Sequence, residues 1–253
     1  MEIQILGPLS LARDGTARDV GSARVRTVLA MLSFTPGTAL SANQLVDELW
    51  PDRAIGNTRN ALQANVVRLR KLLESVSGVR GDILVRTTSV GYLLDVPADA
   101  VDAHRFLDLA ERGARNVTRE PELAVEQLES ALRLWRGPAL FDVAGGHRCQ
   151  GEATLLDERR LAAREDLIAA KLATGGERVV VSELKQLVAE HPERERFSEQ
   201  LMIALYRSGR QAEAVDVFHY ARKWLDRELG LEPGRPLRQL YHSILNQDQL
   251  LSA

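Results

Sequence analysis

The 253-residue sequence predicts a mainly α-helical chain in two parts, a small α+β domain over residues 1–97 and an all-α domain over residues 98–253. Two observations carry this prediction. Strand-like and helix-like segments alternate only in the first part, whereas the second part contains helical patterns that recur every 34 residues. A chain of this length can bury more than one hydrophobic core, which is consistent with two domains.

The N-terminus predicts a small antiparallel sheet. Three short β-prone segments follow one another, Glu2–Leu6, Ser10–Ala12 and Thr16–Val20. The dipeptide Asp14-Gly15 is a strong turn signal between the second and the third.

Two short helices follow this sheet. Apolar residues at helical spacing predict the first from about Ser22 to Phe34, and Thr35-Pro36-Gly37 ends it. Ser41 and Gln44 have the spacing of a capping box, in which each side chain binds the backbone amide of the other residue. This second helix should stop at Trp50-Pro51, before a loop that reaches residue 57.

A long helix is predicted from Asn57, its possible N-cap, to Val76. Its apolar residues lie on one face at a spacing typical of an amphipathic helix. These residues are Leu62, Val66, Leu69 and Leu73. The exposed half is rich in Arg, Lys, Asn and Gln. Such a face suits DNA, although an ordinary amphipathic helix with a solvated polar face would show the same pattern.

The segment that follows predicts a β-hairpin, Ile83–Arg86 against Tyr92–Val96, with a turn near Ser89-Val90-Gly91. The order of sheet, two helices, long basic helix and hairpin is that of a winged helix-turn-helix. In this fold the third helix enters the major groove and the wing lies along the DNA backbone or minor groove. The order of elements favours DNA binding more than any single element does.

The charge distribution supports this interpretation. The net charge is −2, but residues 1–98 carry 11 Lys+Arg against 9 Asp+Glu and the remainder carries 22 against 26. Between Arg53 and Arg86 there are seven basic residues and two acidic ones. This local excess of positive charge would attract a polyanion, and the acidic second part is not expected to share that partner.

The candidate DNA-binding residues lie at three places. In the long helix we expect Asn60, Gln63, Ala64 and Val67 nearest the base edges, Arg68 and Lys71 on phosphates, and Arg59 and Arg70 on the flanks of the apolar stripe. At the start of the first helix, Arg24 and Arg26 are candidates for a phosphate contact, with solvated charge as the alternative. At the wing the candidates are Arg86, Thr87 and Thr88.

The second part reads as helix, turn, helix throughout, with Asp102 as a possible cap of its first helix. Four pairs of positions lie 34 residues apart: Gly175 and Gly209, Val180 and Ala214, Leu184 and Phe218, Leu187 and Ala221. This period, with its turn glycine, is typical of tetratricopeptide repeats. A weaker copy contains Ala124, Leu128 and Ala131, and it is separated from the next repeat by an insertion of 22 residues that covers the Gly/Pro-containing stretch 136–151. The segment Pro236–Leu245 should close the solenoid.

The sequence contains no assembled catalytic motif, so we expect neither an enzyme nor a cofactor. His147 and Cys149 are close together, but a zinc site needs about four ligands, and we expect a surface loop there instead. No apolar run approaches a membrane span, and the N-terminus does not resemble a signal peptide. Cys149 is the only cysteine. We therefore expect a cytoplasmic protein, associated with the nucleoid.

The order of these parts resembles the Streptomyces antibiotic regulatory protein family, in which an OmpR-like winged helix precedes a bacterial transcriptional activation domain of tetratricopeptide type. The matching segments are SANQLVDELWPD (41–52), ALQANVVRLRKLL (61–73), VGYLL (90–94), DAHRF (102–106), LRLWRGPAL (132–140), LMIALYRSGRQAEAVDVF (201–218) and RELGLEPGRPLRQLYHSIL (227–245). The segment GGHRCQGEATLL (145–156) departs from the family pattern.

The resemblance implies an activator of secondary-metabolite gene clusters. Such a protein binds direct repeats of double-stranded DNA near promoters as paired protomers and recruits RNA polymerase, including its sigma subunit. The alternative is a tetratricopeptide-type adaptor whose basic helix docks an acidic partner protein.

Overall fold

The computed structural model describes residues 1–51 and 57–248, so most of the loop expected before the long helix lies outside the described residues. The chain forms two compact units. The first contains residues 1–111 and 129–162, and the second contains residues 112–128 and those from 163 onward. Among the described residues, no helix is long and apolar enough to cross a membrane. The domain boundary expected between residues 97 and 98 stays a prediction.

The first unit opens with the predicted antiparallel sheet, of order β1-β2-β3. Its strands are β1 (Glu2–Gln4), β2 (Ser10–Arg13) and β3 (Thr16–Asp19). Asp14 and Gly15 both have positive φ in the turn between the last two strands, as the turn signal predicted. Ile3 and Leu11 are fully buried and face each other across the first pair of strands.

Helices α1 (Ala23–Ser33) and α2 (Ala42–Leu49) lie where the sequence predicted them. The capping box is formed, with the Ser41 hydroxyl accepting from the Gln44 amide at 3.2 Å and the Gln44 side chain accepting from the Ser41 amide at 2.9 Å. A two-residue strand, β4 (Leu40–Ser41), precedes α2 and was not predicted. It is too short to show alternation, and only its pairing with the wing defines it.

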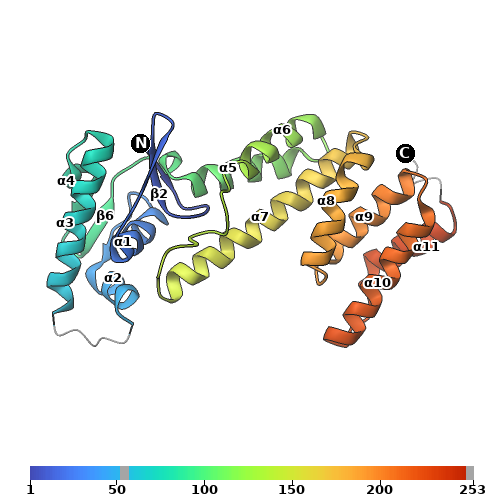
Figure 1. The fold of residues 1–253 in the computed structure, drawn as a ribbon. Coiled ribbons are helices and arrows are strands. Elements are labelled where there is room, and N and C mark those ends of the chain that lie inside the picture. The colour runs from blue at the N-terminus through green and yellow to red at the C-terminus, as the bar shows by residue number, and fades with distance from the viewer. Residues whose placement is uncertain (52–56, 249–253) are drawn as a thin grey trace. The chain divides into compact units, whose positions relative to one another are not determined.

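The long helix is α3 (Thr58–Ser77), with Asn57 as its N-cap and Gly78 in the left-handed conformation at its end. The four predicted stripe residues are buried. The predicted start of the hairpin was wrong, because Ile83 lies in the short helix α4 (Gly81–Leu84) and is 53% exposed. The wing contains β5 (Val85–Thr87) and β6 (Gly91–Leu94), and Figure 1 shows it beside α3 and α4.

The physical reason for α4 is a close crossing of the chain. A Cβ atom at Gly81 would overlap the backbone of Arg70, so the chain passes directly against α3 before it becomes extended. The wing sheet then has the order β4-β6-β5, and Leu40 pairs with Tyr92.

After a short 3₁₀ turn (Ala98–Ala100) the chain forms α5 (Asp102–Asn116), α6 (Pro121–Leu132) and α7 (His147–Ala173). The Asp102 carboxylate, predicted to cap α5, accepts hydrogen bonds from the Ile5 and Leu6 amides at 2.8 and 3.1 Å. Burial raises the pKa of Asp102 to about 6.

The segment Arg136–Cys149, here called the return segment, runs back against the N-terminal elements of the first unit. The Arg136 amide donates to the Leu6 carbonyl at 2.8 Å, and the Leu140 amide donates to the Ile5 carbonyl at 2.9 Å. The expectation of a surface loop at His147 and Cys149 was wrong, since both belong to the first turn of α7 and the cysteine is only 3% exposed.

The second unit contains α8 (Glu177–Glu190), α9 (Glu195–Arg207), α10 (Gln211–Leu229) and α11 (Arg235–Leu245) (Figure 1). Helices α8 and α10 begin 34 residues apart, which confirms the predicted period. Gly175 and Gly209 precede them with φ of 78° and 75°, a conformation that favours glycine. The repeat positions Val180, Leu184, Ala214 and Phe218 are buried.

Candidate nucleic-acid interface

Helix α3 presents one continuous polar face to solvent. Seven of the predicted residues are exposed on it: Arg59, Asn60, Gln63, Ala64, Val67, Arg68 and Lys71. They recur at i, i+4 and i+8 and therefore share one side of the helix. Within residues 1–51 and 57–248, the side chains of Arg59, Arg68 and Lys71 have no hydrogen-bonding or ionic partner. Their positive charges are available to an external ligand.

The same helix is firmly held on its other side. Leu62, Val66 and Leu69 are at most 1% exposed. Asn65 is also buried, and its Nδ2 donates to the Ala61 carbonyl at 2.8 Å, within the helix itself. The Asn57 side chain accepts from the Asn60 amide at 3.3 Å. The helix therefore offers its exposed face without needing to reorganise.

Arg70 differs from the other arginines of α3. Its Nε and Nη2 donate to the Val85 carbonyl at 2.9 and 2.7 Å, and Nη2 also donates to the Thr87 hydroxyl at 2.8 Å. The structure therefore gives both Arg70 and Thr87 partners inside the protein. The sequence offered no signal for this pairing, because the two residues lie in different elements and share no periodic pattern.

The wing presents its remaining candidates at its tip and outer edge. Arg86 forms an exposed ion pair with Asp95 at 3.1 Å, which solvent weakens and a phosphate can replace. Thr88 closes the tip, since its amide donates to the Gly91 carbonyl at 2.8 Å and its hydroxyl accepts from the Gly91 amide at 3.1 Å. An open hollow of about 250 Å³ between wing and α3 is lined by Arg59, Gln63 and the wing tip.

The two arginines of α1 have different surroundings. Arg24 is exposed, and its guanidinium lies over the Trp50 ring, 5.5 Å from the ring centre. Arg26 is turned inward, where it donates to the Val20 carbonyl at 2.6 Å and the Asp142 carbonyl at 3.0 Å. Its guanidinium also lies 3.3 Å from the Asp142 carboxylate. Sequence reasoning read Trp50 only as a helix stop and missed its support of Arg24.

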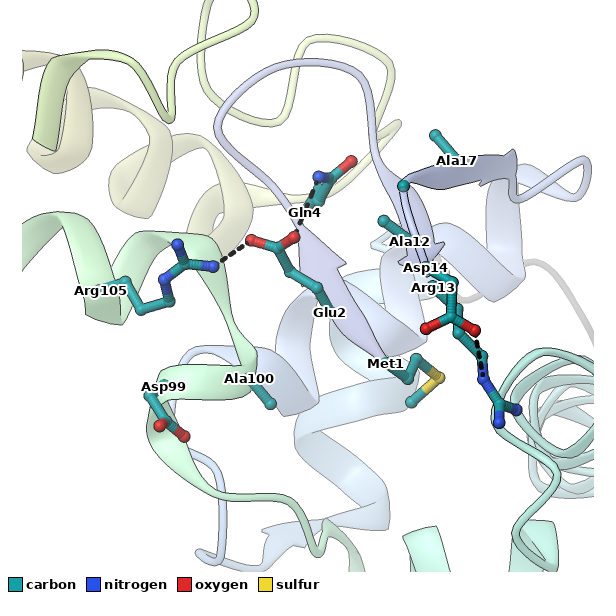
Figure 2. A pocket seen from close by; sticks show the side chains of 11 residues that line it. Met1, Glu2, Gln4, Ala12, Arg13, Asp14, Ala17, Asp99, Ala100 and Arg105 are labelled. Carbon is teal, nitrogen blue, oxygen red and sulfur yellow. Dashed lines mark hydrogen bonds and ion pairs between the residues drawn. The ribbon is translucent and has the colours of Figure 1, made fainter. Parts of the chain in front are cut away.

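A larger hollow of about 560 Å³ lies beside β1 and β2 (Figure 2). Its charged side chains are mostly paired, Glu2 with Arg105 and Arg13 with Asp14. Figure 2 shows Asp99 at the edge of this hollow, away from both pairs. The hollow combines opposite charges, whereas the charged residues among the seven exposed candidates of α3 are all positive.

Both parts of the chain match known protein families. A family model described as "Transcriptional regulatory protein, C terminal" matches residues 20–94, and one described as "Bacterial transcriptional activator domain" matches residues 101–245. The transcriptional regulator RedD of Streptomyces coelicolor is 47% identical over 252 residues, covering 99% of this chain and 72% of RedD. The regulatory protein DnrI of Streptomyces peucetius is 38% identical, covering 98% of this chain and 93% of DnrI.

A solved structure is similar over nearly the whole chain. It is Mycobacterium tuberculosis EmbR in complex with a low-affinity phosphopeptide, with a TM-score of 0.92 and 33% sequence identity. The match covers 97% of this chain and 65% of the EmbR chain, so this chain spans about two thirds of that protein.

Proposed function

This chain belongs to the Streptomyces antibiotic regulatory protein family, and from that premise we propose that it activates transcription by binding direct DNA repeats beside promoters. The chain is a DNA-binding transcriptional regulator. The observation that carries the finer proposal is the exposed face of α3, where cationic and amide side chains that have no side-chain partner among the described residues lie on a well-packed helix.

The proposed contacts divide into two classes. Asn60, Gln63, Ala64 and Val67 face the base edges, where amides can bind adenine and apolar groups can meet a thymine methyl. Phosphates are bound by Arg59, Arg68 and Lys71 on α3, by Arg86 and Thr88 on the wing, and by Arg24 at the start of α1. Arg26, Arg70 and Thr87 are left out of this set, because each is hydrogen-bonded to another element of the fold, whereas the partners of Arg86 and Thr88 lie in or next to the wing itself.

The target genes in this proposal are those of a secondary-metabolite cluster. Two protomers occupy adjacent repeats head to tail, with half-sites about one helical turn apart. The helical second part pairs the protomers and recruits RNA polymerase through its sigma subunit. The protein acts in the cytoplasm at the nucleoid, through binding and not through catalysis.

The first test is selection of bound duplexes from genomic fragments and from a random-sequence pool at moderate salt. We expect a direct repeat to be enriched. Binding without any sequence preference would refute a specific activator. Capture of an acidic protein from nuclease-treated lysate, with no enriched duplex, would favour the adaptor instead.

The second test separates the two classes of contact. Arg68→Ala should weaken binding to all duplexes about equally and flatten the salt dependence by about 0.9 in log–log slope. Asn60→Ala should change sequence preference at one position, by about 1–3 kcal/mol. Equal, sequence-independent losses in both variants would contradict this division.

A further inference from the structure

We propose that Arg70 is a positioning residue, which fixes the wing against the recognition helix so that both elements meet the DNA in one fixed geometry. This inference rests on the proposed function, because it assumes that α3 and the wing bind the same duplex. It assigns Arg70 a role through other residues and not a contact with DNA.

Arg70 is hydrogen-bonded to both ends of strand β5. Two nitrogens of the Arg70 guanidinium donate to the Val85 carbonyl, and one of them also reaches the Thr87 hydroxyl. Val85 and Thr87 are the first and last residues of β5, so the guanidinium contacts both ends of that strand. A planar, charged fork holds such acceptors in a fixed direction, which a flexible lysine ammonium does not do.

The hydrogen bonding between α3 and the wing is concentrated in one residue. In the part of the chain that the structure describes, the hydrogen bonds between α3 and the wing all come from Arg70. The other side of the wing is tied to β4, where Leu40 pairs with Tyr92 and Ser41 with Gly91. Buried Val85 and Leu94 pack the wing onto the core, while its hydrogen bonds to α3 come from one arginine.

The backbone of Arg70 also determines where the wing begins. Gly81 lies so close to Arg70 that a Cβ atom there would overlap the arginine carbonyl. Helices α3 and α4 therefore cross at Arg70, directly before the chain enters β5 at Val85. The side chain and the backbone of this one residue fix both the start and the direction of the wing.

The test compares Arg70→Lys with the wild type on a duplex that the wild type selects from a random-sequence pool. The substitution keeps the positive charge but loses the fork. We expect binding to be about tenfold weaker and the hydroxyl-radical footprint to be lost at the wing end of the site. The dependence of affinity on salt should become flatter, by the same amount as in Arg86→Ala, because both variants lose the phosphate contact of the wing. The double variant Arg70→Lys/Arg86→Ala should bind no more weakly than Arg70→Lys alone.

Arg80→Lys is the matched control. Arg80 precedes α4 and its side chain is 73% exposed and paired with Asp82, so its replacement should leave the footprint and the salt slope unchanged. Thr87→Val keeps the shape of the side chain at position 87 and removes only the hydrogen bond that Arg70 Nη2 donates to the Thr87 hydroxyl. It should therefore weaken the wing footprint partially. This second variant carries the test if Arg70→Lys does not fold.

A merely structural role gives a different result. Suppose that Arg70→Lys lowers the melting temperature but, when measured well below that temperature, keeps the wing footprint and the salt dependence of the wild type. The positioning role is then refuted, while the proposed function stands. If the wild type selects no duplex at all, the proposed function fails and this inference fails with it.

Discussion

Replacing Glu48 by alanine should release the start of α7. Glu48 belongs to α2, is 7% exposed, and accepts hydrogen bonds from the Cys149 amide at 2.8 Å and the Arg148 amide at 3.2 Å. Both amides lie in the first turn of α7, where backbone donors have no partner within the helix. A carboxylate from α2 therefore caps a helix that begins about one hundred residues later in the sequence.

The expected loss follows from three contributions. Losing the capping hydrogen bond to the Arg148 amide costs about 1 kcal/mol. Removing a negative charge from a partly buried helix N-terminus costs about another 1 kcal/mol. Leaving the buried Cys149 amide without an acceptor adds about 1 kcal/mol or more. Glu48→Ala should thus lower the local stability by about 3 kcal/mol, which corresponds to a roughly hundredfold change in an opening equilibrium. Glu48→Gln keeps one acceptor oxygen and should lose about 1 kcal/mol.

Amide hydrogen exchange measures this directly. In Glu48→Ala the protection factors of the Arg148 and Cys149 amides should fall by about hundredfold, or to the limit set by global unfolding. Glu126→Ala is the control, since Glu126 is an exposed residue of α6 and should leave these two amides unaffected. Unchanged protection in the Glu48 variant would show that the carboxylate does not stabilise the start of α7.

Further predictions concern a buried carboxyl group and two glycines. The pKa of Asp102 is raised to about 6, so the folded protein binds more protons than the unfolded chain between about pH 4 and 6. As the pH rises through this window, urea titrations should show the free energy of unfolding of the wild type falling relative to that of Asp102→Asn, by up to about 3 kcal/mol. Parallel pH profiles of the two proteins would contradict the raised pKa. Gly209→Ala places a side chain at a φ of 75° and should destabilise the protein by about 1 kcal/mol in thermal unfolding. Gly151→Ala, within α7 and with open space around it, should instead stabilise it by up to about 1 kcal/mol, and equal effects of the two changes would refute the conformational argument.

Features encoded by neighbouring residues were predictable from the sequence. The capping box needs only Ser41 and Gln44, and the buried stripe of α3 needs only helical spacing. The turn glycines at 175 and 209 repeat with the helices they precede. In each case the physical cause lies within one turn or one repeat of the residue concerned, so local patterns were sufficient.

Features that depend on distant partners were not predictable. Strand β4 exists because Leu40 meets Tyr92, and α4 forms where Gly81 crosses Arg70. The inward direction of Arg26 depends on Asp142, which lies 116 residues further along the chain. Helical spacing placed the exposed face of α3 correctly, but in a sequence an arginine that contacts the protein cannot be told from one that is free to contact a ligand.

The return segment shows how such distant partners can matter for DNA binding. In the sequence it interrupts the repeat, and its last residues, from 145 onward, depart from the family pattern, yet it contacts both helices that precede α3. Arg26 of α1 donates to the Asp142 carbonyl, and the Thr27 hydroxyl of α1 donates to the Ala144 carbonyl at 3.1 Å. Glu48 of α2 accepts from the Cys149 amide at the start of α7. Helices α1 and α2 both pack against α3. The return segment is therefore connected to α3 through α1 and α2, within the close-packed interior of the first unit.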